Sequence, residues 1–242
     1  MKKYELTEET KVIGGKTLFR IRALRSFGGI KAGDLGGFIE NERNLSHGGN
    51  AWVGGNAEVY GNAQVVGYAQ VGGNAQVGGN AQVNGYAQVG GNAWVEDNAQ
   101  VGGNARVSGD AWVEDNARVD GDAWVGGYAR VNGDAQVVGD ARVDGNAQVG
   151  GDAWVGGNAR VGGDGLINSN NDYLCEQGLG SRNRSASFFK CKDGHIHVLC
   201  GCFSGNLDEF ENKVKEEHGN SKYSKEYLGF IEVVKTHFEV RQ

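Results

Sequence analysis

Residues 69–80 read AQVGGNAQVGGN, two copies of a six-residue unit that recurs nineteen times between Ala51 and Val161. Alanine occupies every sixth position from Ala51 to Ala159, and valine occupies every sixth position from Val53 to Val161. A short fixed period of this kind is typical of a solenoid, in which each repeat packs only against its neighbours. The repeat therefore decides the architecture of a large part of the chain before any residue propensity is considered.

Each unit predicts one short strand followed by one corner. Ala and Val stand two residues apart, so their side chains point to the same face of a strand, and the residue between them points the other way. The next Ala follows four residues after Val, which leaves no room for a helix or for a hairpin that returns antiparallel. Gly, Asn and Asp dominate these corners because they tolerate the positive φ of a tight bend. The chain is therefore expected to wind in one direction around columns of Ala and Val.

The array resembles the hexapeptide-repeat family, whose signature is Val at the first position, often Gly at the second and a small residue at the fifth. The resemblance implies a mainly β protein, a left-handed parallel β-helix whose triangular coils contain 18 residues, or three units, each. The array would then form about six coils stacked about 4.8 Å apart. A right-handed solenoid is the alternative, because the hand comes from the resemblance.

The chain divides into three expected segments: an N-terminal capping segment (1–34), the hexapeptide-repeat β-helix (35–167) and a C-terminal α+β domain (168–242). In the first segment, residues 17–24 predict a strand. Ile39 and Leu45 fall in the alanine phase of the repeat, which predicts a first, imperfect coil that starts near Leu35.

Residues 168–242 lack the repeat and predict two strands and two helices. The strands cover 187–191 and 195–200, on either side of a Lys-Asp-Gly turn. Asn206 is the expected N-cap of the first helix, with Glu209 in the capping-box position, and Gly219 is its expected end. The second helix is expected over 221–238.

Taken as a whole, the chain resembles phage- and prophage-encoded hexapeptide-repeat proteins. The residues that carry the resemblance are the Asn-Ala-x-Val array, Gly33-Asp34-Leu35-Gly36-Gly37, Gly180-Ser181-Arg182, Cys200-Gly201-Cys202-Phe203 and Leu207-Asp208-Glu209-Phe210. Related genes are often named as acyltransferases on the repeat alone. The resemblance implies no established activity.

Composition and charge limit which compartment and which classes of partner we expect for this protein. The net charge is −6, and residues 51–167 carry 13 acidic and 5 basic side chains, which does not suit a nucleic-acid binder. No stretch approaches the roughly 20 apolar residues of a membrane span, and the N-terminus has no apolar signal region. We therefore expect a cytoplasmic protein, in the host cytoplasm if phage-encoded, without nucleic-acid or membrane partners.

Four cysteines lie in the last third of the chain: Cys175, Cys191, Cys200 and Cys202. They lack the paired Cys-x₂-Cys spacing that zinc sites usually show, so reduced thiols are expected. His195 and His197 share one strand face and have the spacing for a metal, but exposed strand histidines are common. The expectation is therefore of no metal and no cofactor.

An acyltransferase is the first alternative for function, because many left-handed β-helices are acyltransferases. Enzymes of that kind use a histidine base and loops that leave the coil to hold an acyl carrier. The array has no histidine between His47 and His195, and no unit carries an insertion. A general base must lie within reach of the group that it deprotonates, so catalysis along the array is not expected.

Candidate binding residues lie in the C-terminal segment. Ser181 and Arg182, followed by Arg184, form a glycine-flanked turn that could hold an anion through guanidinium groups and amides. A plain turn is the simpler interpretation. Cys202 and His218 could form a thiol–imidazole pair, although the sequence does not place them together.

The five tryptophans all occupy the outward position between Ala and Val. With three units per coil, Trp94 and Trp112 stack on one side, and Arg130 follows them. Packing between coils and a partner or subunit interface both explain such residues. Left-handed β-helix proteins often trimerise side by side, so the resemblance, together with these outward tryptophans, implies a homo-oligomer, a trimer before a dimer.

These observations predict a non-enzymatic binding or scaffold protein of phage or prophage origin, for which counter-defence is one candidate role. Its partner would be a host protein or a small anionic ligand, bound through the C-terminal domain. An acidic DNA-mimic solenoid is the second alternative, because the second half of the array is acidic at its corners. Arg side chains interrupt that negative field at Arg106, Arg118, Arg130, Arg142 and Arg160.

Overall fold

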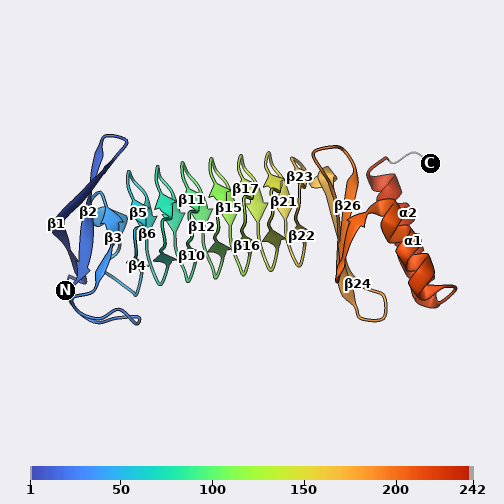
Figure 1. Ribbon diagram of the computed structural model, residues 1–242, viewed down its shortest axis with the longest axis horizontal. Helices are drawn as coiled ribbons and strands as arrows, with labels where there is room; N and C mark the ends of the chain where they lie inside the picture. Colours follow the sequence, from blue (N-terminus) through green and yellow to red (C-terminus); the bar gives the residue numbers. More distant parts are fainter. Residues whose placement is uncertain (1, 240–242) are drawn as a thin grey trace.

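The computed structural model describes residues 2–239 and forms a rod with a cap at each end (Figure 1). The middle of the rod is a parallel β-solenoid of about seven coils. Each coil contributes one short strand to each of three sheets, and strands three apart in the sequence are neighbours.

The strands of the solenoid are two residues long and belong to three sheets. The longest sheet begins with three N-terminal strands: β1 (Tyr4–Ile13), β2 (Lys16–Ala23) and β3 (Leu35–Ile39). Seven solenoid strands follow in the same sheet: β5 (Glu58–Val59), β8 (Gln76–Val77), β11 (Trp94–Val95), β14 (Trp112–Val113), β17 (Arg130–Val131), β20 (Gln148–Val149) and β23 (Leu166–Ile167). The second sheet contains β4 (Trp52–Val53), β7 (Gln70–Val71), β10 (Gln88–Val89), β13 (Arg106–Val107), β16 (Trp124–Val125), β19 (Arg142–Val143) and β22 (Arg160–Val161). The third contains β6 (Gln64–Val65), β9 (Gln82–Val83), β12 (Gln100–Val101), β15 (Arg118–Val119), β18 (Gln136–Val137) and β21 (Trp154–Val155).

The register confirms the predicted coil of 18 residues. Val95 pairs with Val113, and Val113 pairs with Val131, so like residues stack in columns. Every alanine and valine at the two repeating positions, Ala51 to Ala159 and Val53 to Val161, is buried, with at most 2% of its surface exposed. The core is thin, and each coil is stabilised mainly by stacking on its two neighbours.

Asparagine side chains add a second ladder at the corners, which the sequence did not predict. The amide nitrogen of Asn62 donates to Asn80, Asn80 donates to Asn98, and Asn98 donates to Asn116, each over 3.0 Å. The ladder ends on the carboxylate of Asp134, which accepts from Asn116. An amide can donate to one neighbour and accept from the other, so a column of Asn satisfies itself between coils.

The first coil has a different register from the one predicted. Ile39 pairs with Val59 and Leu45 bridges to Val65, so both occupy the valine columns, and their predicted place in the alanine phase is wrong. The corner between Leu45 and Val53 is longer than in the array, which shifts the phase of the preceding coil. The predicted register assumes an unbroken six-residue period across this corner.

The N-terminal segment covers one end of the solenoid core. Strands β1 and β2 form an antiparallel hairpin, and β2 pairs antiparallel with β3. Tyr4, Ile21 and Ala23 are buried against the first coils. The predicted strand over 17–24 is confirmed as β2, whereas β1 was not predicted. Most of β1 is exposed, so its sequence lacks a strong apolar alternation.

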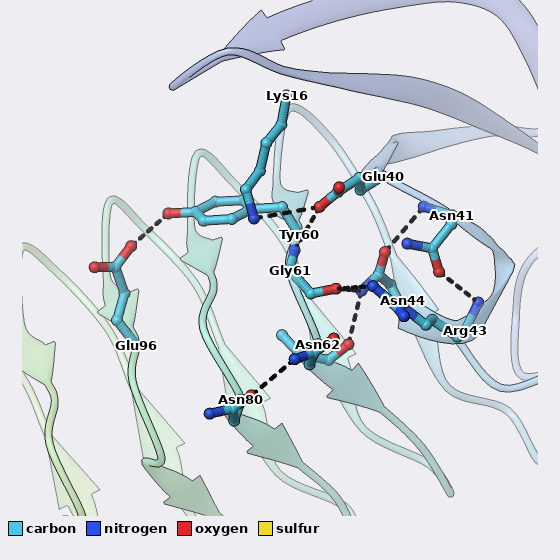
Figure 2. A network of polar contacts seen from close by, with 11 residues as sticks. Lys16, Glu40, Asn41, Arg43, Asn44, Tyr60, Gly61, Asn62, Asn80 and Glu96 are labelled. Atoms are coloured by element: carbon cyan, nitrogen blue, oxygen red, sulfur yellow. Dashed lines mark hydrogen bonds and ion pairs between the residues drawn. The ribbon is translucent and has the colours of Figure 1, made fainter.

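Polar contacts fix this cap to the coils (Figure 2). The backbone N–H of Gly61 donates to the Glu40 carboxylate, which lies 3.5 Å from the Lys16 amine. The Asn44 side chain, in the short helix η1 (Glu42–Asn44), donates to the carbonyl oxygens of Gly61 and Ala63. These contacts satisfy backbone groups that the end of a solenoid would otherwise leave unpaired.

The C-terminal segment is a four-stranded antiparallel sheet with two helices packed on it, joined to the last coil by η2 (Asn170–Asp172). Its elements are β24 (Tyr173–Leu179), β25 (Arg184–Lys190), β26 (Ile196–Cys200), β27 (Phe203–Asn206), α1 (Leu207–His218) and α2 (Lys222–His237). The two predicted strands and both helices are present, with the capping box between Asn206 and Glu209. Strands β24 and β27 were not predicted.

This sheet lies between the solenoid and the helices (Figure 1). Because side chains alternate along β25, Phe189 packs into the solenoid core while Ala186 and Phe188 pack against α1 and α2. Both faces of the sheet are therefore covered, and the last coil does not expose its core.

Candidate functional site

The row of outward aromatic residues on the longest sheet is arranged as predicted. The rings of Trp94 and Trp112 stack at 5.1 Å with an interplanar angle of 5°, and the Arg130 guanidinium lies 5.0 Å from the Trp112 ring. Trp52 differs, because only 4% of it is exposed and Phe27 of the N-terminal cap packs against it at 5.5 Å. Trp52 is therefore an internal contact of the cap, although its position in the repeat is outward.

The C-terminal candidates all line one pocket of about 540 Å³, here called the arginine pocket. It brings together the five residues named from the sequence: Ser181, Arg182, Arg184, Cys202 and His218. They come from the β24–β25 turn, from β25, from the turn before β27 and from the end of α1. The fold thus joins segments that the sequence left separate.

Two glycines make room for this arrangement. A Cβ on Gly180 would lie 2.3 Å from the Tyr227 hydroxyl, and Gly180 has a φ of +69°. A Cβ on Gly201 would lie 1.9 Å from a guanidinium nitrogen of Arg184. Because Gly180 has no side chain, Tyr227 of α2 can approach the turn between β24 and β25. Because Gly201 has no side chain, Arg184 can lie across the turn that precedes β27.

Charge in the arginine pocket favours an anion. Among residues 2–239, neither Arg182 nor Arg184 has a carboxylate within ion-pair distance, whereas the Lys213 amine lies 3.1 Å from the Glu217 carboxylate. Burial raises the pKa of Tyr227 to about 12, with a further contribution from Cys200, so this phenol is neutral near pH 7. The two guanidinium groups therefore give the pocket a net positive charge.

The thiol–imidazole pair that the sequence left open is not formed. Cys202 and His218 line the same pocket, but no hydrogen bond joins them in the part of the chain that the structure describes. The His218 ring stacks instead on Tyr227, at 5.6 Å with an interplanar angle of 18°. The Cys202 thiol is exposed.

The remaining walls of the arginine pocket were not predicted from the sequence as part of this site. Phe203, Phe210 and Tyr227 form its aromatic side, and Lys213 and Glu217 line its edge. Four of the α1 residues that line the pocket, 210, 213, 214 and 217, follow the pattern i, i+3, i+4 and i+7, which is the spacing of one helix face. That spacing was a usable signal, but nothing in the sequence showed that this face lies opposite the turn of Arg182.

The solenoid shows neither feature expected of an acyltransferase within the described residues. His47 lies under the N-terminal cap, stacked on Tyr4 at 4.4 Å. Strand pairs from β4 to β23 keep an unbroken register, so no loop leaves the coils between them.

Comparison with known proteins agrees with the repeat. The family model of the YdcK beta solenoid repeat matches residues 99–114. No curated protein matches the chain. The fold and this match together define a β-solenoid repeat protein. Within residues 2–239, neither α1 nor α2 is long and apolar enough to cross a membrane.

Proposed function

We propose that this chain is a non-catalytic binding protein that holds a small anionic ligand in the arginine pocket. The observation that carries the proposal is the convergence of Arg182 and Arg184, without carboxylate partners among the described residues, on a pocket with an aromatic wall. A guanidinium group binds a carboxylate or phosphate through two parallel hydrogen bonds. Phe203 and Phe210 would contact an apolar or aromatic part of the same ligand.

The solenoid would serve as a rigid spacer in this proposal. Its coils repeat the same chemistry, whereas a binding site needs converging polar groups of different kinds. The resemblance to phage- and prophage-encoded proteins supports a narrower version, in which the ligand belongs to the host cytoplasm and the protein acts in counter-defence.

A host protein that binds the solenoid side is the second candidate. The stacked pair of Trp94 and Trp112, with Arg130 beside it, favours this candidate because Trp and Arg are enriched among the residues that dominate interfaces. The same surface supports the proposed homotrimer.

The test uses calorimetry with two probes, inorganic phosphate and adenosine monophosphate, on the full chain. We expect the nucleotide to bind more tightly than phosphate, because its base can stack on the aromatic wall. Arg182→Ala should weaken nucleotide binding by about tenfold or more, the loss expected for one charge-assisted contact. Arg160→Ala is the matched control, because it removes an exposed arginine of β22 outside the pocket.

Equal binding by Arg182→Ala and by wild type would place the anion elsewhere. Pull-down of a host protein that survives Arg182→Ala, but is lost in the double variant Trp94→Ala/Trp112→Ala, would favour the solenoid side as the recognition surface.

A further inference from the structure

A second cluster of reactive side chains lies at the junction of the solenoid and the C-terminal sheet. Cys191, His195 and His197 each place one ligand atom within 4.8 Å of the other two. They line a pocket of about 640 Å³ that shares no residue with the arginine pocket. This group is called the cysteine–histidine cluster below.

The hairpin between β25 and β26 builds the cluster. The N–H of Cys191 donates to the carbonyl of His195 over 2.9 Å, and the N–H of Gly194 donates to the carbonyl of Cys191. Cys191 therefore lies opposite His195. This pair is next to Lys190–Ile196, the last residue pair between β25 and β26. His197 is two residues from His195, so its side chain projects from the same face.

Each histidine ring has one nitrogen engaged by a neighbour. His195 Nδ1 contacts the Asp193 carboxylate, which can only accept, so in the neutral ring Nδ1 is the donor and Nε2 is the nitrogen with a lone pair. His197 Nε2 lies 2.9 Å from the Ser204 hydroxyl, so Nδ1 is the nitrogen of this ring that could bind a metal. A hydrogen-bonded nitrogen on the far side of the ring is the usual arrangement of a metal-binding histidine, because it fixes the tautomer and the ring orientation.

We propose that Cys191, His195 and His197 bind one divalent transition-metal ion and that Zn²⁺ fits best. One thiolate and two imidazoles form a donor set that zinc prefers, and three protein ligands leave one position for water or a further group. Asp164, Asp208 and Glu209 line the same pocket, so its charge also favours a cation. The proposal replaces the sequence-based expectation of no metal, which considered only cysteine spacing and the two histidines on one strand.

The location suggests what the ion would do. Cys191 is 5% exposed, belongs to the solenoid core cluster, and bridges to Gly165 of the last coil. The N–H of Lys192 donates to the carbonyl of Asp164 beside it. An ion held by Cys191 and the two histidines would stiffen the hairpin that closes the solenoid and would leave one position open to the pocket.

The first test measures zinc bound to the full chain. The protein is stripped with a chelator, incubated with Zn²⁺, separated from free metal by gel filtration and assayed by mass spectrometry. We expect one ion per chain in the wild type and in Cys202→Ser, which removes an exposed thiol outside the cluster. Mutation of a residue that hydrogen-bonds a metal ligand typically lowers metal affinity roughly 10–100-fold. Mutation of a ligand itself should lower the affinity further. His195→Gln and Cys191→Ser should therefore each weaken zinc binding by at least about 100-fold.

Asp193→Asn should have the smaller, roughly 10–100-fold effect, because Asp193 would act only by orienting His195. Should Cys191→Ser fail to fold, His195→Gln decides, because the His195 side chain is exposed. Failure of the wild type to retain zinc, or full retention by His195→Gln, would overturn the proposal.

The second test replaces zinc with Co²⁺ and records the absorption spectrum. A thiolate ligand gives a charge-transfer band in the near ultraviolet. We expect the band in the wild type and in His218→Gln, and we expect it to disappear in Cys191→Ser. A bound cobalt ion without this band would show that Cys191 is not a ligand, and the proposed site would be wrong.

Discussion

Tyr60 donates a hydrogen bond to the Glu96 carboxylate, 36 residues further along the chain (Figure 2). Two coils separate these residues, so the Tyr60 ring lies across the coil between them, at Gly78. A Cβ on Gly78 would lie 2.4 Å from the ring. The Lys16 amine of the N-terminal cap lies 5.5 Å from the same ring. One side chain thus connects the cap with three successive coils.

Tyr60→Phe should lower the free energy of unfolding by about 1.5–3 kcal/mol, because it removes a hydrogen bond to a charged group. Burial and the Glu96 carboxylate raise the pKa of Tyr60, so the hydroxyl remains a donor through neutral pH. Tyr86→Phe is the control, since the Tyr86 ring stacks on Tyr68 in an exposed position. Denaturant unfolding of both variants checks the prediction, and equal losses would contradict it.

Gly78→Val should displace the Tyr60 ring and destabilise the fold by about 1–3 kcal/mol, the usual cost of forcing extra atoms into a packed site. Gly72 holds the same place after its valine in the preceding six-residue unit, on another side of the solenoid, and a Cβ there would meet nothing within 4 Å. Gly72→Val should therefore be tolerated. In the double variant Tyr60→Ala/Gly78→Val, the cost of the valine should largely disappear, which a double-mutant cycle measures.

Val107→Asp should be one of the most damaging substitutions in the solenoid. Val107 is 1% exposed, and an aspartate there would bury a charge without a partner in a thin core, at a cost of several kcal/mol. Gln88→Asp adds the same charge at an exposed outward position of the neighbouring coil. Thermal unfolding should separate the two variants widely. A soluble Val107→Asp protein with unchanged melting would contradict the assignment of inside and outside.

The contact between α1 and α2 should depend on pH through Glu211. Hydrogen bonds from Lys215 and then Lys235 hold the pKa of Glu211 below its usual value. A carboxyl whose pKa is lower in the folded state stabilises that state above its unfolded pKa of about 4.3. This stability is lost as the pH falls through the folded pKa. We therefore expect Glu211→Gln to be less stable than wild type at pH 7, and we expect this difference to shrink as the pH falls below about 4.3.

Helical circular dichroism reports this contact, because α1 and α2 are the only α-helices among residues 2–239. Glu216→Gln is the control, since Glu216 has no ion-pair partner within the same residues. A pH dependence that Glu211→Gln leaves unchanged would contradict the role of Glu211.

Light scattering tests the proposed homotrimer. The exposed edges of Trp94 and Trp112 are expected to contact a second copy, so Trp94→Ala/Trp112→Ala should shift the mass toward that of one chain, 25.7 kDa. Trp154→Ala removes the most exposed tryptophan, which lies on the third sheet, and should leave the mass unchanged. A wild-type protein with the mass of a single chain at high concentration would refute the oligomer.

The sequence by itself determined the coil, the inward columns and the two C-terminal helices. Each depends on residues close together in the chain: the six-residue period, the capping box of Asn206 and Glu209, and the apolar spacing of α1. The period failed only at the corner before Ala51, where Ile39 and Leu45 shift to the valine columns. A local pattern cannot show where its own phase changes.

Tertiary structure alone decided which side chains meet. Arg182 and His218 line one pocket because the turn between β24 and β25 lies beside the end of α1, and no spacing in the sequence encodes that contact. The cysteine–histidine cluster depends on both the local sequence and the tertiary structure. The register of its hairpin follows from the turn, whereas its position beside Asp164 depends on how the sheet packs on the last coil. A solenoid repeats one set of contacts and can be predicted from a single unit. The sites lie where unlike elements pack together, and those contacts depend on the whole folded chain.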